Sequence, residues 1–420
     1  MGGARGTHRR DGDIQQLAGS IEDCSRPTDV RKFETQILGV SGEWPTPPTK
    51  WSFSALKDVE ACPRRWALSN ATYGGLWEGR GYPRRPSLST LIGLVVHRSA
   101  ESILRSLSNA GCSGIEDPSS TVVLQDLGGI SGVLSLQLEA ELNELRSNPR
   151  ATRMSDYLKR QLTEQVPSMR TAVQQLMRSI ERISPRQKHP LPATLQASRL
   201  RPGTYPEQVV ADDALRFMGI VDLLEVTEEG AEIIDFKSGS PDIAHEEQVR
   251  CYSTLWKHDV IRNPEGRPAT RLRIVYPSSS IDLALDGVDY DDARDSLRTR
   301  IEVATEALEK GIPKARPSPD TCRYCSVRHL CDEYWETGTN RERTNPIDLE
   351  LEVRELRTAN SGTVQLRQTS SHAAICGPID GIESGDHVRA LELYRSDDYE
   401  TEEVQLRVVP HSELFVMRAE

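Results

Sequence analysis

The sequence predicts a mixed α/β domain, in which a sheet is flanked by helices, followed by a small β-barrel. Two observations lead to this prediction. First, β-branched and alternating runs between about residues 193 and 277 are interrupted by one helical run and flanked by helical patterns on both sides. Second, five short alternating runs separated by turn residues follow residue 346, and a run of that length suits a five-stranded, OB-like barrel.

The composition fits a globular protein with cores of its own. The chain has 420 residues, of which 37% are hydrophobic, enough for two or three domains. No run approaches the roughly 20 apolar residues of a membrane span, and the opening MGGARGTHRRDGD lacks the apolar segment of a secretory signal. We therefore expect a cytoplasmic protein with no membrane contact. The net charge of −11 argues against a basic nucleic-acid coat but allows a local basic track.

The N-terminal part of the chain predicts a leader and two helices. Residues 1–45 are rich in Gly, Arg, Asp and Thr and end in a proline-dense stretch, so we expect them to be flexible. A first helix is expected to begin at Ser54, its N-cap, because apolar residues recur at helical spacing in FSALKDVEACPRRW. A second, buried helix is expected over 88–107, capped by Ser89 or Thr90.

The middle of the chain changes from helical to β texture. Residues 130–185 hold helix formers with apolar residues at three- and four-residue steps, which predicts a helical insertion. The segments that follow predict strands at 193–200, 207–213, 215–227 and 231–239, a helix at 243–256, a strand at 271–277 and a long helix at 291–310.

Polar, proline-terminated sequence separates this region from the barrel. We expect one domain over 46–336, a linker over 337–346 and the barrel over 347–420. OB-like barrels often bind single-stranded nucleic acid, but the visible aromatic residues are few here and the charges are mostly acidic. A protein-docking or purely structural barrel is therefore an equal alternative.

One hairpin carries a chemically suggestive group of charges. In GIVDLLEVTEEGAEIIDFKSG, Asp222 and Asp235 can lie side by side on neighbouring strands, and Asp235 and Lys237 share a face. Two carboxylates and an ammonium suit phosphodiester cleavage: the carboxylates hold Mg²⁺ or Mn²⁺, which activates a water, and the lysine positions that water or stabilises charge. The alternative is a surface hairpin with ordinary charges, which is the commoner explanation of an isolated D-x-K.

Other motifs accompany the hairpin in a fixed order. Gln248 and Tyr252 are four residues apart and share a helix face. His97 follows Gly93 by one turn in an apolar helix, where a lone histidine is more often a core residue. Together, G-x-x-x-H, G-x-x-D, D-x-K and Q-x-x-x-Y resemble the RecB-like branch of the PD-(D/E)XK nuclease superfamily, over about residues 51–335.

The cysteines resemble those of the iron–sulfur members of this branch, such as the AddB nuclease subunit and the CRISPR-associated RecB-like nucleases. Cys62 lies in the first-cysteine context, and Cys322, Cys325 and Cys331 follow as C-x2-C-x5-C. The resemblance implies a [4Fe-4S] cluster that joins the start of the domain to its end as a structural staple. Zinc is the alternative, held by the four thiolates or by a knuckle that uses His329.

The resemblance also implies a restriction-endonuclease-like sheet and roles for individual residues. The implied ligands of the catalytic metal are His97, Asp222, Asp235 and the Phe236 carbonyl. Lys237 would be the catalytic lysine, with Gln248 and Tyr252 on the DNA-facing side of the catalytic site. Glu207 is a further acid that could join the metal shell, although an ordinary surface acid is the favoured interpretation.

Arginines alternate with aromatic residues between the first cysteine and the histidine. They are Arg64, Arg65, Arg80, Arg84 and Arg85, interleaved with Trp66, Tyr73, Trp77 and Tyr82. Arginines neutralise phosphates and aromatic rings stack on unpaired bases, so this mixture suits a channel for single-stranded nucleic acid. Alternatively the tryptophans belong to the core and some arginines are solvated, and both interpretations remain open.

The resemblance implies a metal-dependent DNA nuclease, expected to be an exonuclease on single-stranded or end-frayed DNA. Its context would be repair, recombination or defence against mobile elements. The alternative is a non-catalytic iron–sulfur subunit that binds nucleic acid in a larger helicase–nuclease or defence complex. The sequence has no P-loop, so processive degradation of duplex DNA would require a helicase or another partner subunit.

Overall fold

The fold consists of two compact units, which are described separately: residues 38–342, and residues 343–420 with 1–37. The computed structural model describes residues 34–35, 44–73, 76–77, 80–151, 154–184, 199–338, 345–367, 369–379, 381–397 and 404–417. Most of the predicted leader, most of the strand predicted at 193–200 and much of the predicted linker lie outside the described residues. The predicted domain boundaries stay predictions.

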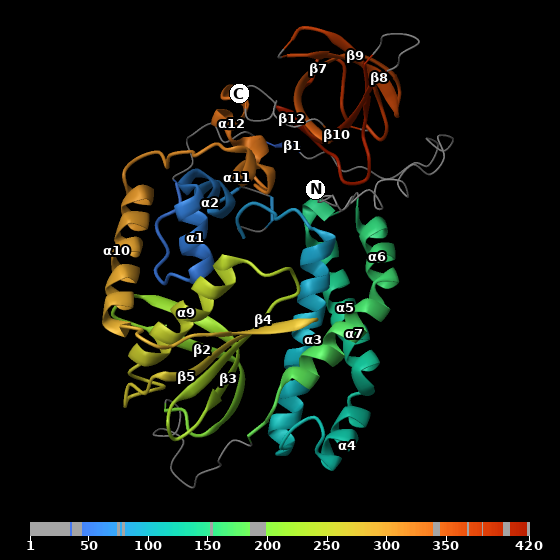
Figure 1. Ribbon diagram of the computed structural model, residues 1–420. Coiled ribbons are helices and arrows are strands. Elements are labelled where there is room, and N and C mark those ends of the chain that lie inside the picture. Colours follow the sequence, from blue (N-terminus) through green and yellow to red (C-terminus); the bar gives the residue numbers. More distant parts are fainter. Residues whose placement is uncertain are drawn as a thin grey trace, which may run out of the picture. The chain divides into compact units, whose positions relative to one another are not determined.

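The larger unit is built on a mixed five-stranded sheet with the order β2-β3-β4-β5-β6 (Figure 1). Its strands are β2 Gly203–Asp212, β3 Phe217–Val226, β4 Ala231–Phe236, β5 Ala269–Tyr276 and β6 Ser279–Leu283. The pairs β2–β3, β3–β4 and β5–β6 are antiparallel, whereas β4 and β5 are parallel and are connected through helix α9, Ile243–His258. The predicted mixed α/β class is confirmed, while β6 was not expected from the sequence.

Both faces of the sheet are buried, and this explains the apolar run before Asp235. Ile233 of β4 belongs to a core that contains Val249 and Trp256 of α9. The next residue, Ile234, belongs to a second core with Leu104 of helix α3. Since side chains alternate along a strand, a strand covered on both faces is apolar throughout, and a charge in it needs a specific partner.

The helices follow the predicted pattern, with corrected starting points. They are α1 Phe53–Ala61, α2 Pro63–Asn70, α3 Leu88–Ala110, α4 Pro118–Asp126, α5 Gly129–Ser147, α6 Ser155–Glu164, α7 Val166–Ser179, α10 Tyr290–Glu309, α11 Pro319–Arg323 and α12 Asp332–Glu336, with short 3₁₀ turns at Pro149–Ala151 and Arg328–Leu330. The N-caps of α1 and α3 are Ser52 and Ser87, and the predicted caps are wrong. The extended backbone of these serines lets each hydroxyl accept the amide hydrogen three residues on.

Helices α5, α6 and α7 occupy the helical insertion predicted over 130–185, and α5 and α7 pack against each other and against α3 (Figure 1). By length and composition alone, one helical stretch here, Pro118–Ser147, could cross a membrane, with a mean hydropathy of 1.2. Gly128 and Gly129 divide it, because both adopt positive φ angles of 76° and 70° that end α4 and start α5. A single such stretch is weak support, and a membrane span is not indicated.

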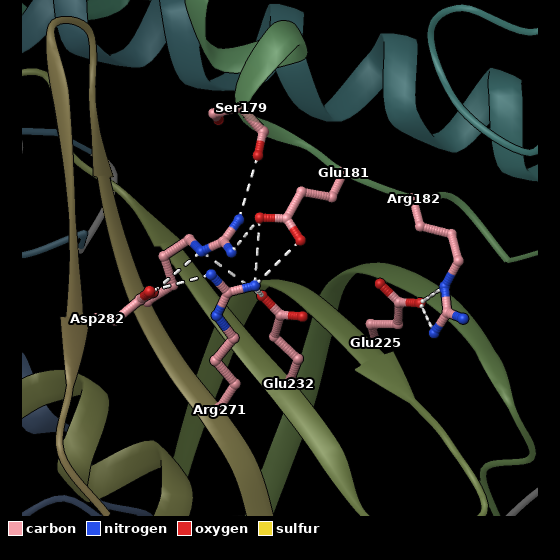
Figure 2. A network of polar contacts seen from close by, with 8 residues as sticks. Ser179, Glu181, Arg182, Glu225, Glu232, Arg271 and Asp282 are labelled. Atoms are coloured by element: carbon pink, nitrogen blue, oxygen red, sulfur yellow. Dashed lines mark hydrogen bonds and ion pairs between the residues drawn. The ribbon is translucent and has the colours of Figure 1, made fainter.

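A network of charged residues connects the segment that follows α7, the last helix of the insertion, to the sheet (Figure 2). Arg273 of β5 is only 4% exposed and pairs with Glu181, which follows α7, at 2.6 Å, and with Asp282 of β6 at 3.2 Å. It also donates to the Ser179 carbonyl at 3.2 Å. Arg271, two residues earlier on the same face, pairs with Glu181 and Asp282 as well. The insertion is therefore held against β5 by directional contacts in addition to apolar packing.

The smaller unit contains a closed five-stranded barrel. Its strands are β7 Ile347–Thr358, β8 Ser361–Leu366, β9 His372–Cys376, β11 Val404–Arg407 and β10 His387–Asp397, and pairing of β10 with β7 closes the ring. Strand β12, Glu413–Met417, was not expected and extends the sheet beyond β10, where β1, Glu34–Thr35, adds to it in parallel. A closed barrel is consistent with the prediction, while its OB-like type stays a prediction.

Candidate metal centre

The candidate site begins where strands β3 and β4 separate. Leu223 and Ile234 are paired, so the next residues outward, Asp222 and Asp235, lie next to each other as predicted. The Phe236 N–H donates a hydrogen bond of 2.6 Å to Asp222 Oδ2. This bond fixes the orientation of the Asp222 carboxylate.

A third carboxylate faces Asp222 from the other side. The register of β2 on β3 places Glu207 directly opposite Asp222. Glu207 has a φ of 51°, which is unusual for a residue with a side chain. Like charges directly opposite on paired strands repel each other, so this arrangement calls for a cation between them. The Glu207 side chain is only 23% exposed and lies in the group of possible metal ligands, which favours a place in the metal shell over an ordinary surface acid.

His97 completes a ligand group. Its Nε2 lies 3.0 Å from Asp222 Oδ1 and its Nδ1 lies 3.5 Å from Glu207 Oε1. One ligand atom from each of these three residues lies within 4.8 Å of the other two, and among the described residues this is the one group of His, Cys, Asp and Glu that meets this criterion. The structure thus places His97 at the site and not in the core.

The charges perturb one another strongly. Burial alone would lower the pKa of His97, but its hydrogen bond to Asp222 and the nearby carboxylates outweigh burial and raise that pKa to about 9. Burial, and then the charge of Asp222, raises the pKa of Glu207 to about 7. The same two causes raise the pKa of Asp235. In the metal-free site these side chains therefore bind protons, and a bound cation would displace those protons.

Lys237 is held by a relay from helix α9. Its Nζ lies 2.7 Å from Asp235 Oδ2 and donates to Gln248 Oε1 at 2.9 Å. Gln248 Nε2 in turn donates to the Tyr252 hydroxyl at 2.6 Å. Tyr252 is only 5% exposed, and its ring packs against Gly219, where an added Cβ would lie 2.4 Å from Tyr252 Cε1. The G-x-x-D glycine thus makes room for the tyrosine of the relay.

The donor set fits a divalent metal. Glu207 Oε1 is buried and accepts no hydrogen bond, and the buried Asp235 Oδ2 has the Lys237 ammonium beside it at 2.7 Å; a cation would relieve the cost of burying these oxygens. Carboxylate oxygens suit Mg²⁺ and Mn²⁺, and imidazole is a ligand of the transition metals. His97, Asp222, Asp235 and Glu207 could hold such an ion, and ligation by the Phe236 carbonyl stays a prediction.

The four predicted cluster cysteines lie around one buried cavity, although they are up to 269 residues apart along the chain. All four are at most 9% exposed. Cys62 Sγ accepts amide hydrogens from Arg65 and Arg316, each at 3.4 Å. No three of the sulfur atoms meet the 4.8 Å criterion that the acidic group meets. The ligand role of the cysteines therefore stays a prediction.

His329, the residue that the alternative of a zinc knuckle would use, lies in an aromatic environment. His329 is fully buried, and its Nε2 lies 2.6 Å from the Tyr82 hydroxyl. The two rings also contact each other, with centroids 4.9 Å apart. His329 therefore packs on an aromatic residue of the core, and it is absent from the residues that line the cysteine cavity.

The basic and aromatic segment divides between core and surface. Trp66, Tyr73 and Tyr82 are at most 8% exposed and belong to the core. Among the arginines, Arg64 pairs with Glu333 at 2.7 Å, Arg65 with Asp58 at 2.6 Å, and Arg80 stacks on Trp77; Arg84 is exposed and Arg85 is half-buried. Contact of Arg64, Arg65, Arg80, Arg84, Arg85 and Tyr252 with nucleic acid stays a prediction.

Comparison with known families decides the family. A model described as the PD-(D/E)XK nuclease superfamily matches residues 50–332, more than half of the chain. The protein belongs to this superfamily. The match covers the whole group from His97 to Tyr252 as well as the four cysteines. PD-(D/E)XK nucleases use divalent metals, in agreement with the acidic ligand group found here.

Other comparisons add little to the superfamily assignment. Solved structures that are similar to parts of the chain include the following two. One is titled "Structure of murine DNA binding protein bound with ds DNA" (11% identity, covering 47% of this chain and 84% of that chain) and the other "Crystal structure of p204 HINb domain" (12%, 52% and 97%). Both have a TM-score of 0.16, which is too low to carry an argument. No curated protein matches the chain.

Proposed function

We propose that this PD-(D/E)XK protein is a divalent-metal-dependent nuclease that hydrolyses phosphodiester bonds of DNA, with single strands or frayed ends as its substrate. The observation that carries the proposal is the ligand group of His97, Glu207 and Asp222 beside the ion pair of Asp235 and Lys237. Mg²⁺ or Mn²⁺ bound there would polarise the phosphate and lower the pKa of a bound water.

The residues of the candidate site would have separate roles in catalysis. His97, Asp222 and Asp235, with Glu207, would hold the cation. The Lys237 ammonium has three donors, of which Asp235 and Gln248 use two. The third can serve a phosphate oxygen or the attacking water, where the positive charge stabilises the charge that develops in the transition state.

We further propose that the protein is a RecB-like exonuclease. The relay from Lys237 through Gln248 to Tyr252 supports this assignment, because the Q-x-x-x-Y motif resembles that branch and contacts the lysine directly. Degradation of long duplexes would depend on a helicase or another partner that supplies single strands, since the sequence lacks a P-loop.

The nuclease proposal is tested by cleavage of end-labelled single-stranded and blunt duplex DNA in Mn²⁺. We expect the parent to cut and Lys237→Ala and Asp235→Ala to be inactive. The matched control is Lys310→Ala, since Lys310 is 73% exposed and lies outside the site. The product ladder of an exonuclease would shorten from one end. If the parent binds DNA without cutting it, the alternative of a non-catalytic binding subunit is favoured.

We also propose that Cys62, Cys322, Cys325 and Cys331 hold a [4Fe-4S] cluster. Their shared cavity and the two N–H···S hydrogen bonds to Cys62 support it, because such bonds stabilise thiolate ligands of iron–sulfur clusters. A tetrahedral zinc site with Zn–S bonds of about 2.3 Å would instead draw the sulfurs to about 3.8 Å from one another. No three of the four sulfurs lie within 4.8 Å of one another.

Iron and acid-labile sulfide analysis of anaerobically purified protein tests the cluster. We expect about four of each per chain. Cys62→Ser should lose both, whereas Cys112→Ser, at a buried cysteine that does not line the cavity, should retain them. Stoichiometric zinc in place of iron would contradict the proposal.

A further inference from the structure

A cavity of about 390 Å³ opens directly beside the candidate metal centre. It shares His97 and Lys237 with that centre, so the cavity adjoins the centre. Beyond these two residues its walls are mainly apolar: Leu94, Val96, Leu176, Phe236 and Pro277. The hydroxyl residues Ser89, Thr90 and Ser238, together with Gly93, complete the lining.

This combination fits one part of a nucleic-acid strand. An apolar cavity does not stabilise a charged phosphate. The base attached to the neighbouring sugar, in contrast, has two apolar faces and a polar edge. Cavities of roughly 300–1,000 Å³ with apolar walls and a few polar groups are typical binding sites for small organic groups. We propose that the cavity is a nucleobase subsite, which accepts one base of the strand whose phosphate lies at the metal centre; this inference rests on the proposed nuclease function.

Helix α3 and the segment after β4 approach each other closely on one side of the cavity. Gly93 of α3 faces Ser238 of the segment after β4 so closely that a Cβ at residue 93 would lie 2.7 Å from the Ser238 hydroxyl oxygen. The backbone of α3 at Gly93 therefore lies directly against the Ser238 side chain. Leu94 follows in the same helix, lines the cavity and is 37% exposed, so it lies where the cavity meets solvent.

A walled cavity of this size selects unpaired nucleotides. A base in a duplex keeps its Watson–Crick edge against its partner, and the base must leave the stack before it can enter a pocket. Enclosure of a base against apolar and aromatic side chains is typically worth about 1–3 kcal/mol. The subsite would thus give a physical reason for a preference for single-stranded or frayed DNA at the cleavage position.

Abasic scanning of a substrate tests the subsite. A fluorescein-labelled single strand is prepared in versions that each carry one tetrahydrofuran abasic nucleotide at a different position. Cleavage is measured in Mn²⁺, and binding is measured by anisotropy in Ca²⁺. We expect one position relative to the cut at which loss of the base weakens binding and slows cleavage about tenfold, as stacking energies of that size imply.

Leu94→Trp fills the cavity without replacing any of the proposed ligands. It should cut the intact strand about tenfold more slowly than the parent, become insensitive to the abasic position and keep the Mn²⁺ affinity of the parent. Leu94→Ala keeps the cavity open and should keep the sensitivity. Asn109→Trp, at an exposed position near the other end of α3, should behave as the parent does.

The outcomes separate the subsite from the proposed function. If the parent cuts and no abasic position matters, or if Leu94→Trp stays sensitive, the subsite is wrong and the nuclease stands. If the parent never cuts but binding in Ca²⁺ depends on one base and on Leu94, the nuclease function is wrong and the subsite stands.

Discussion

The Phe236 N–H donates a 2.6 Å hydrogen bond to Asp222 Oδ2, while Asp222 Oδ1 lies 3.0 Å from His97 Nε2. One carboxylate thus has two functions. One oxygen stabilises the end of β4, which carries Asp235 and Lys237, and the other belongs to the candidate metal site. The strand that supplies half of the site is therefore fixed by a ligand of the other half.

Substitutions of Asp222 should separate these two functions. Asp222→Asn and Asp222→Ala should both weaken Mn²⁺ binding at least tenfold, as titration calorimetry would show, because each removes a charged ligand. Only Asn retains an oxygen that can accept the Phe236 N–H. Asp222→Ala should therefore unfold with a free energy about 1–3 kcal/mol below that of Asp222→Asn. Equal stability of the two variants would show that the hydrogen bond is not stabilising.

Metal binding should depend steeply on pH. In the free site the pKa of His97 is about 9 and that of Glu207 about 7, so at neutral pH His97 is protonated and Glu207 is about half protonated. A cation must displace these protons, and its affinity should therefore rise as pH increases from 6 to 9. Calorimetry at pH 7 in buffers of different ionisation enthalpy should detect release of about one proton or more per Mn²⁺. A pH-independent affinity would contradict the ligand group.

Much of the site could be predicted because its spacing is local. Asp235 and Lys237 are two residues apart on a strand, and Gln248 and Tyr252 are four apart on a helix, so each pair shares a face whatever the rest of the fold does. The hairpin that joins β3 to β4 is equally local. The sequence thus predicted most of the elements and the residues that meet at the strand end.

Glu207 was underestimated because its role depends on a longer-range register. Only the pairing of β2 with β3 places it opposite Asp222. A signal was present, since alignment of the two strands about the turn after Asp212 would have brought the two acids together. Ser52 and Ser87 were missed for another reason. Several serines or threonines precede each helix, and the backbone conformation alone decides which one caps it.

The hydrogen-bond relay from helix α9 to Lys237 predicts that substitutions in the relay lower kcat and leave the Mn²⁺ affinity unchanged. Gln248→Ala removes the acceptor that holds Lys237 Nζ at 2.9 Å, so the ammonium should lose its fixed position. We expect kcat to fall about ten- to hundredfold, as misplacement of a catalytic group by 1 Å can cause, with Mn²⁺ affinity unchanged. Tyr252→Phe leaves the contact between Gln248 and Lys237 intact and should lower kcat only a few fold. Steady-state kinetics on a labelled single strand measures both variants.

The network around Arg273 predicts that a substitution outside the candidate metal centre greatly lowers the free energy of unfolding. Arg273 is 4% exposed, and Arg273→Met would leave Glu232, whose side chain is 20% exposed but whose Oε1 atom is buried, with one arginine fewer. We expect the free energy of unfolding in urea to fall by about 3 kcal/mol, as when one partner of a buried ion pair is removed. Arg298→Met removes an exposed pair with Asp295 and should cost less than about 1 kcal/mol. Equal effects would show that burial of the network adds nothing.

Gly219→Ala tests whether packing of Tyr252 against β3 sets the geometry of the site. The new Cβ would lie 2.4 Å from Tyr252 Cε1 and 2.7 Å from Cδ1, and the buried ring has little room to move. We expect a loss of about 1–3 kcal/mol in unfolding free energy, together with lower activity, because displacement of Tyr252 also moves Gln248. Gly239→Ala, whose Cβ would meet nothing within 4 Å, is the matched control and should change neither property. In the Gly219→Ala background, Tyr252→Leu should restore stability but return activity only to within the few-fold loss expected of Tyr252→Phe, since it relieves the clash and removes the hydroxyl at the end of the relay. Additive stability effects of these two substitutions would show that the ring and the glycine do not interact.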